Sequence, residues 1–156
     1  MLIEIERKFL VADDSWRRLY TRCERLRDGL IAATDGLKVR VRLYEDHATL
    51  AVKTKQVGFT RAEYEYEIPM DEGEQLLALH CGITKLVKTR YYVPHRGFTW
   101  EVDVYEEILA GIILAEVELS RADMDVPLPP WIGREVTGEL AYKKINMLKT
   151  RLARSA

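Results

Sequence analysis

The stretch MLIEIERKFLV, residues 1–11, alternates apolar and charged side chains. Glu4, Glu6 and Lys8 stand two residues apart, and Ile5 lies between the two acids. This period of two predicts a β-strand with one apolar and one charged face. The charged face carries two acids and a base in a row, so it is either the solvated side of a sheet or the wall of a polar interior.

The same alternation returns in later segments, again with charges two residues apart. Like charges at that spacing share one face within about 7 Å and repel each other. A solvated face with weak surface ion pairs explains any single segment. For the whole set we favour charged faces that point inward around a wet cavity, because metal cations and an anionic ligand would neutralise them there. The paired charges are Arg40 and Arg42, Lys53 and Lys55, Glu63, Glu65 and Glu67, Lys88 and Arg90, Glu101 and Asp103, and Glu116 and Glu118.

The pattern predicts an α+β fold, mainly β. Most connections between expected strands are too short for parallel crossovers, so the strands should be antiparallel. A barrel of about eight strands is wide enough to hold a ligand. We expect an eight-stranded antiparallel β-barrel that forms a polar tunnel, with a few helices packed outside. The helices are expected at residues 16–26, 71–82 and 135–154, a short strand at 27–33, and an extended proline-rich loop at 125–133.

Helix ends are expected from local capping signals. Residues 13–15 offer N-cap side chains before the first helix, and Thr137 offers one before the last. Asp71 and Glu74 can form a capping box, and Gly82 can end that helix.

Bulk composition narrows the class of protein. The chain of 156 residues suits a single domain over residues 1–156. Its net charge of -1 excludes a generally basic surface of the kind that binds nucleic acid. The spacing of Cys23 and Cys81 fits no metal or redox motif, and no apolar run is long enough for a membrane span. We expect a cytoplasmic protein without nucleic-acid or membrane partners, and exposed outer barrel surface compatible with a homodimer.

The charge pattern also indicates what occupies the cavity. Clustered carboxylates suit hard cations such as Mg²⁺ or Mn²⁺. Arginine and lysine side chains suit phosphate groups. Both together predict a polyphosphate with bridging divalent metal ions.

The order of these charges resembles the CYTH superfamily, the triphosphate tunnel metalloenzymes, in its compact bacterial form. The segment Glu4-x-Glu6-x-Lys8 matches the ExExK signature of that family. The later charged pairs, residues 61–65 and the segment PPWIGREVTG at 129–138 continue in family order. Two positions depart from it: Leu30 stands where relatives often have tyrosine, and Lys144 where they often have asparagine.

The resemblance implies residue roles. Phosphate-binding residues would be Lys8, Arg40, Arg42, Lys53, Lys88, Arg90 and Lys143. Glu6 and Glu118 would hold a metal ion that bridges the phosphates. Glu4, Asp103 and Glu116 would serve a second metal ion and the attacking water, with support from Glu63 and Glu65. Residues with a catalytic role would be Glu4, Glu6, Lys8, Lys53, Glu116 and Glu118.

The resemblance further implies a metal-dependent triphosphatase that uses Mg²⁺ or Mn²⁺ at a two-metal site. The short chain leaves little material to enclose a base, which favours inorganic tripolyphosphate over nucleoside triphosphates. Adenylate cyclase, thiamine triphosphatase and a polyphosphate-binding module without turnover remain alternatives.

Overall fold

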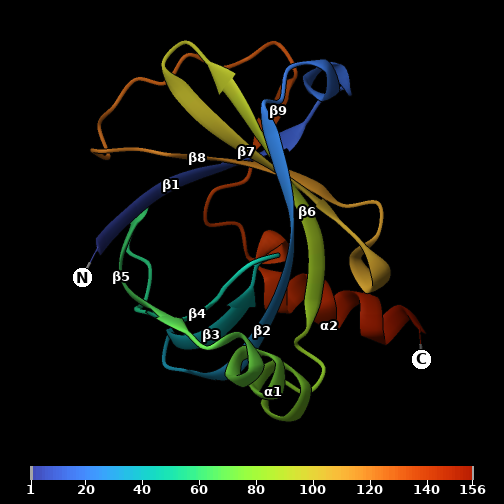
Figure 1. The fold of residues 1–156 in the computed structure, drawn as a ribbon. Coiled ribbons are helices and arrows are strands. Elements are labelled where there is room, and N and C mark those ends of the chain that lie inside the picture. The colour runs from blue at the N-terminus through green and yellow to red at the C-terminus, as the bar shows by residue number, and fades with distance from the viewer. Residues whose placement is uncertain (1, 156) are drawn as a thin grey trace.

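The computed structural model describes residues 2–155 and consists mainly of a closed antiparallel barrel (Figure 1). Eight strands follow one another in the order β5-β4-β3-β2-β6-β7-β8-β1, and pairing of β1 with β5 closes the ring. The predicted eight-stranded antiparallel barrel is confirmed. The strands are β1 (Leu2–Val11), β2 (Arg22–Thr34), β3 (Leu37–Leu43), β4 (Ala48–Lys53), β5 (Thr60–Ile68), β6 (Leu86–His95), β7 (Phe98–Tyr105) and β8 (Ile113–Glu118).

Two tight hairpins set the register of four of these strands. Asp35 and Gly36 join β2 to β3 with φ angles of 49° and 83°. Arg96 and Gly97 join β6 to β7 with φ angles of 46° and 82°. Two successive residues with positive φ match the twist of the flanking strands, and glycine adopts that backbone at little cost.

The helix predicted at residues 16–26 is wrong. A single 3₁₀ turn, η1 (Ser15–Arg18), is followed by β2, which begins at Arg22 and continues through the short strand expected at 27–33. β2 pairs with β6 along one edge and with β3 along the other. These two ladders override the weak local helix preference of the segment.

Helix α1 (Met70–His80) confirms the second predicted helix and covers the outer face of β2, β3 and β4. The proposed capping box is wrong, because Pro69 is the N-cap residue and no side chain caps the helix. Glu74 instead forms an ion pair with Arg27. Gly82, with a φ of 53°, follows the helix end as expected.

The C-terminal helix is shorter than predicted. After the 3₁₀ turns η2 (Glu107–Leu109) and η3 (Leu140–Tyr142), α2 runs only over Lys144–Ser155. The expected cap Thr137 has another role, since its Oγ1 accepts a hydrogen bond of 2.9 Å from the backbone N–H of Lys8. A further strand, β9 (Ile132–Glu135), pairs with β1. It lies where the sequence predicted the end of the proline-rich loop and the start of the last helix.

The apolar faces of the strands form the core outside the barrel wall. Phe9, Trp16, Trp100 and Trp131 lie in one buried cluster, which ties the proline-rich loop and η1 to the barrel. A second cluster seats α2, whose Met147 and Leu148 pack with residues of β6, β7 and β8. No helix formed by residues 2–155 is both long and apolar enough to cross a membrane.

Candidate active site

The charged faces of the strands enclose one cavity of about 480 Å³. The inward orientation predicted from the alternating charges is therefore what the fold adopts. Two predicted residues do not line the cavity: Lys88 is 1% exposed and Asp103 is fully buried in the wall. The predicted residues that do line it are Glu4, Glu6, Lys8, Arg40, Arg42, Lys53, Glu63, Glu65, Arg90, Glu116, Glu118 and Lys143.

Four acids on the adjacent strands β1 and β8 form what we call the carboxylate group: Glu4, Glu6, Glu116 and Glu118. The ladder sets Glu6 opposite Glu118 and Lys8 opposite Glu116. Burial, with help from Glu116 and Glu4, raises the pKa of Glu6 to about 7. Burial, Glu4 and Glu63 also raise the pKa of Glu118. Negative charge is thus concentrated where β1 meets β8.

Glu4 is held by two basic side chains from neighbouring strands. Lys53 Nζ lies 3.0 Å from Glu4 Oε1, and the guanidinium of Arg61 donates to Glu4 Oε2. Burial raises the pKa of Glu4, but Lys53 and Arg61 outweigh it and lower the pKa to about 2. Arg61 Nη2 also lies 3.6 Å from Glu6. Sequence reasoning left Arg61 out of the site, although it shares the inward face of β5 with Glu63.

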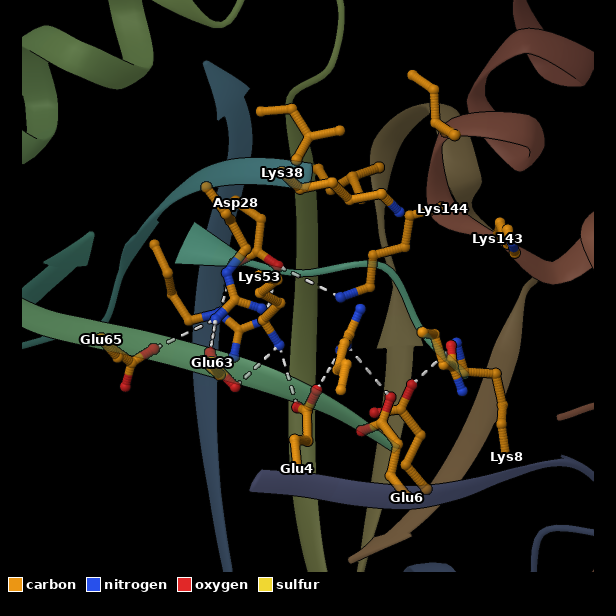
Figure 2. A pocket seen from close by; sticks show the side chains of 18 of the residues that line it. Glu4, Glu6, Lys8, Asp28, Lys38, Lys53, Glu63, Glu65, Lys143 and Lys144 are labelled. Atoms are coloured by element: carbon orange, nitrogen blue, oxygen red, sulfur yellow. Dashed lines mark hydrogen bonds and ion pairs between the residues drawn. The ribbon is translucent and has the colours of Figure 1, made fainter. Parts of the chain in front are cut away.

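Other cavity cations are oriented by carboxylates of the wall (Figure 2). Lys53 Nζ also lies 3.2 Å from Glu63, and Arg40 Nη2 lies 3.4 Å from Glu63 and 3.3 Å from Glu65. On the other side Lys8 Nζ lies 3.2 Å from Glu116. Each pair fixes a long flexible cation at the cavity surface, where it can meet an anion without further ordering.

Arg42 is anchored by an acid that sequence reasoning missed. Its guanidinium donates two hydrogen bonds of 2.6 and 2.7 Å to the carboxylate of Asp28. Asp28 is only 3% exposed and lies on β2 directly opposite Arg42 on β3. Lys144, at the start of α2, approaches the same carboxylate at 3.7 Å.

Asp103 organises a second buried pair of cations. Lys88 Nζ lies 2.5 Å from Asp103, and Arg90 donates hydrogen bonds of 2.7 and 2.9 Å to it. Burial alone would raise the pKa of Asp103, but these cations lower it to about 2. Arg90 also pairs with Glu101 and reaches the cavity, so Asp103 orients a cavity cation from behind the wall.

The donor chemistry of the carboxylate group fits a hard divalent cation. Among residues 2–155, no three His, Cys, Asp or Glu side chains are already gathered in metal-binding geometry. Glu118 nevertheless has no basic partner within 4 Å in that part of the chain. Burial raises the pKa of both Glu6 and Glu118, and neighbouring acids (Glu116 and Glu4 for Glu6, Glu4 and Glu63 for Glu118) add to it, a cost that a cation would relieve. Oxygen-only ligands of this kind suit Mg²⁺ and Mn²⁺.

Comparison with known proteins gives a consistent family match. A family model described as the CYTH domain matches residues 2–150. An inorganic triphosphatase of Acetivibrio thermocellus is 40% identical over 146 residues, which span 94% of this chain and 93% of that protein. An inorganic triphosphatase of Nitrosomonas europaea is 36% identical over 148 residues, 91% and 94% of the two chains.

Solved structures agree with the sequence matches. The crystal structure of an inorganic triphosphatase has a TM-score of 0.65 at 32% identity and covers 95% of each chain. A protein of Pyrococcus horikoshii has a TM-score of 0.60 at 20% identity, covering 76% of this chain and 80% of that one, which shows the shared fold alone.

Proposed function

This chain belongs to the CYTH domain family, and from that premise we propose that it hydrolyses inorganic tripolyphosphate to orthophosphate and pyrophosphate. The observation that carries the proposal is the placing of the carboxylate group and oriented basic residues around one cavity. Carboxylates suit a divalent metal ion and the basic residues suit phosphate, so the cavity offers both halves of a metal polyphosphate site.

The basic residues would bind the substrate and hold its terminal phosphoryl group in place. Lys8, Arg40, Lys53, Arg90 and Lys143 line the cavity and can donate directly to phosphate oxygens. Arg42, also at the cavity surface, is held by Asp28, while Lys88 stays in the wall and adds positive charge. Neutralising the phosphate charge lets an incoming water approach the terminal phosphorus.

The carboxylate group would hold the metal ions. Glu6 and Glu118 are our choice for an ion at the phosphate chain, and Glu4 with Glu116 for a second ion near the attacking water. Glu63 and Glu65 would support this side through Lys53 and Arg40, and Asp103 through Arg90. Bound Mg²⁺ or Mn²⁺ supplies charge neutralisation and lowers the pKa of water.

Hydrolysis then needs one bond to form and one to break. The water oxygen attacks the terminal phosphorus, and the bond from that phosphorus to its bridging oxygen breaks. One glutamate of the carboxylate group accepts a proton from the attacking water. The electron pair leaves with the bridging oxygen on pyrophosphate, and orthophosphate is the second product.

The cavity lining favours an inorganic chain over a nucleotide. Among the described residues that line it, Tyr44 is the single aromatic side chain. Its ring is already stacked on His47, with centroids 4.1 Å apart and planes 7° apart. A nucleobase would therefore find little free aromatic surface to stack on. Stacking on aromatic side chains is the main way in which proteins bind bases without regard to their identity.

We also propose a cytoplasmic location and a homodimer. Cys23 and Cys81 are free thiols, consistent with a reducing compartment. Ile3 and Tyr66 are 50% and 63% exposed, so the outer barrel surface carries apolar area suited to a second copy. Sedimentation of the purified protein would test the second statement, with a monomer at all concentrations as the contrary result.

A phosphate-release panel tests the function directly. Tripolyphosphate, ATP, thiamine triphosphate and pyrophosphate are compared with Mg²⁺ and with Mn²⁺, and cyclic AMP is measured alongside. Tripolyphosphate should be the best substrate, and Glu4→Gln, Glu6→Gln and Glu118→Gln should each abolish turnover while circular dichroism stays unchanged. Glu72→Gln, on the exposed face of α1, makes the same chemical change and should retain full activity.

Other results would redirect the assignment. Cyclic AMP formation from ATP would identify a cyclase, and preference for thiamine triphosphate would identify that activity. Tight binding of tripolyphosphate without phosphate release would leave a binding module. Full metal-dependent activity in all three glutamine variants would remove the carboxylate group from the mechanism.

A further inference from the structure

The strand that carries Glu6 and Lys8 changes its neighbour along one of its edges. On one side β1 pairs with β8 from Glu6 to Leu10 without interruption. On the other side, pairing with β5 ends at Ile5, and pairing with β9 begins only at Phe9. Lys8 therefore lies between two ladders, at the point where β5 has separated from β1 and β9 takes its place.

Both backbone polar groups of Lys8 point to this second edge. Its N–H donates a hydrogen bond of 2.9 Å to Oγ1 of Thr137, and its C=O accepts one of 2.8 Å from the N–H of Val136. The two residues that follow β9 thus supply an acceptor and a donor that a neighbouring strand would otherwise supply. Lys8 is half-buried, and an unpaired backbone group there would cost free energy, so these contacts stabilise β1 at this residue.

A third contact fixes the Thr137 hydroxyl as an acceptor. Its Oγ1 lies 2.8 Å from Oε1 of Glu135 and 3.4 Å from the C=O of Lys8. A hydroxyl has a single proton, and the shorter contact with a carboxylate is the stronger one, so the proton is donated to Glu135. The lone pairs of the oxygen are then free to accept from the N–H of Lys8.

The backbone contact matters because the Lys8 side chain is long and lies in the cavity lining. Its Nζ is 3.2 Å from the carboxylate of Glu116, the residue directly opposite in the β8 ladder. A rotation of the backbone at Lys8 would be amplified along the flexible four-carbon side chain. The ammonium group therefore keeps its place only if the backbone of Lys8 is fixed on both edges of β1.

Resting on the proposed function, we infer that Thr137 is a positioning residue of the site. Its hydroxyl holds the backbone of Lys8 so that the ammonium group meets a phosphate oxygen of bound tripolyphosphate. Thr137 is not among the described residues that line the cavity, so it acts through Lys8. The segment after β9 thereby contributes to substrate binding from outside the barrel wall.

Three substitutions at one position test the role of Thr137. Thr137→Val and Thr137→Ala remove the hydroxyl, and Thr137→Ser keeps it. The first two should raise the dissociation constant for tripolyphosphate about tenfold, as expected for misplacing one charged hydrogen bond, and the third less than about twofold. Amide hydrogen exchange at Lys8 should become faster only in the two variants without a hydroxyl. Circular dichroism verifies that each variant is folded.

A matched control comes from another half-buried threonine on a strand. Thr89→Val, on β6 and outside the cavity lining, makes the same chemical change and should leave the dissociation constant unchanged. Unchanged binding by Thr137→Val and Thr137→Ala would overturn the positioning role. A serine variant that binds as weakly as the valine variant would also overturn it, because the hydroxyl would then not be what matters.

A double variant separates positioning from a general effect on stability. In Lys8→Gln no ammonium group is left to position, so adding Thr137→Val should weaken tripolyphosphate binding no further. Additive weakening in Lys8→Gln/Thr137→Val would overturn the inference, because Thr137 would then act on the site without Lys8.

Binding is measured calorimetrically with a metal chelator present, so the result does not depend on turnover. Tripolyphosphate that binds without being hydrolysed would contradict only the proposed function, and the comparison of variants would still decide the role of Thr137. An unmodified protein that binds no tripolyphosphate would contradict both.

Discussion

Glu6 on β1 and Glu118 on β8 are directly opposed in the antiparallel ladder. Like charges in directly opposed positions destabilise a sheet. The next residue pair on the same face of the ladder is different, because Lys8 lies opposite Glu116 and the two form an ion pair. The barrel therefore neutralises the Lys8–Glu116 pair with its own side chains and leaves two acids opposed in the other pair, where Arg61 Nη2 lies 3.6 Å from Glu6.

The first prediction concerns Glu6→Gln in the presence of a chelator. The folded-state pKa of Glu6 is raised from 4.5 to about 7, so its contribution to stability is present below pH 4.5 and lost as the pH rises to about 7. At pH 8 the free energy of unfolding of the variant should exceed that of the unmodified protein by on the order of 2 kcal/mol. The variant should nevertheless lose activity. Urea denaturation at pH 5 and pH 8 measures the difference.

The pH dependence provides the control for that prediction. At pH 5 the difference in stability should shrink to less than about 1 kcal/mol, because Glu6 is then largely protonated in the folded state. Glu72→Gln, on the exposed surface of α1, should follow the unmodified protein at both pH values. A Glu6→Gln variant that is less stable at pH 8 would contradict the argument from repulsion.

The second prediction concerns Arg61→Gln. Arg61 donates to Glu4 and lies 3.6 Å from Glu6, so its charge competes with a divalent cation for the same carboxylates. Removing it should lower the dissociation constant for Mn²⁺, measured calorimetrically without substrate, by about three- to tenfold. Arg7→Gln, which removes a pair with Glu135 outside the cavity lining, should leave Mn²⁺ affinity unchanged. Weaker Mn²⁺ binding by Arg61→Gln would show that Arg61 orients the ligands instead.

Alternating charge made most of the barrel predictable. A charged residue at every second position predicts a strand, and it also predicts that these charged side chains lie on the same face of the sheet. The pairs Arg40 and Arg42, and Glu116 and Glu118, therefore predicted strand faces that point into the barrel before any strand pairing was known. Glu63 and Glu65 were found by the same rule.

Residues without that repeat escaped prediction for physical reasons. Asp28 lies in RDGLIAA, where its inward neighbours Leu26 and Leu30 are apolar, so only cross-strand pairing reveals its contact with Arg42. Lys144 depends on where α2 begins, and helix boundaries are poorly specified by local sequence. Residues 16–26 carried a plausible helix pattern that the ladders of β2 overrode.

The third prediction concerns Asp28→Asn. Arg42 is 5% exposed and would lose the carboxylate that receives two of its hydrogen bonds. Breaking a buried pair from one side leaves an uncompensated charge and should cost about 3–5 kcal/mol of unfolding free energy. Urea denaturation measures this, and the KM for tripolyphosphate should rise because Arg42 loses its orientation.

An exposed pair supplies the comparison for that variant. Arg27 and Glu74 form an ion pair whose side chains are 36% and 47% exposed, so Glu74→Gln should cost less than about 1 kcal/mol. The variant Asp28→Leu/Arg42→Met, which replaces both partners by apolar side chains, should recover much of the lost stability without recovering phosphate binding. Equal costs for Asp28→Asn and Glu74→Gln would show that burial does not govern the Asp28 pair.

The fourth prediction concerns Gly73→Ala, at the contact between α1 and β4. A Cβ at this position would lie 2.7 Å from the Cβ of Ala48, closer than two carbon atoms can approach. Alanine gains up to about 1 kcal/mol of helix propensity over glycine, but overpacking typically costs about 1–3 kcal/mol. We expect net destabilisation in urea, and restored stability in Gly73→Ala/Ala48→Gly, because the second change removes the clashing methyl group. A stabilised Gly73→Ala variant would mean that α1 shifts away from the barrel without loss of packing.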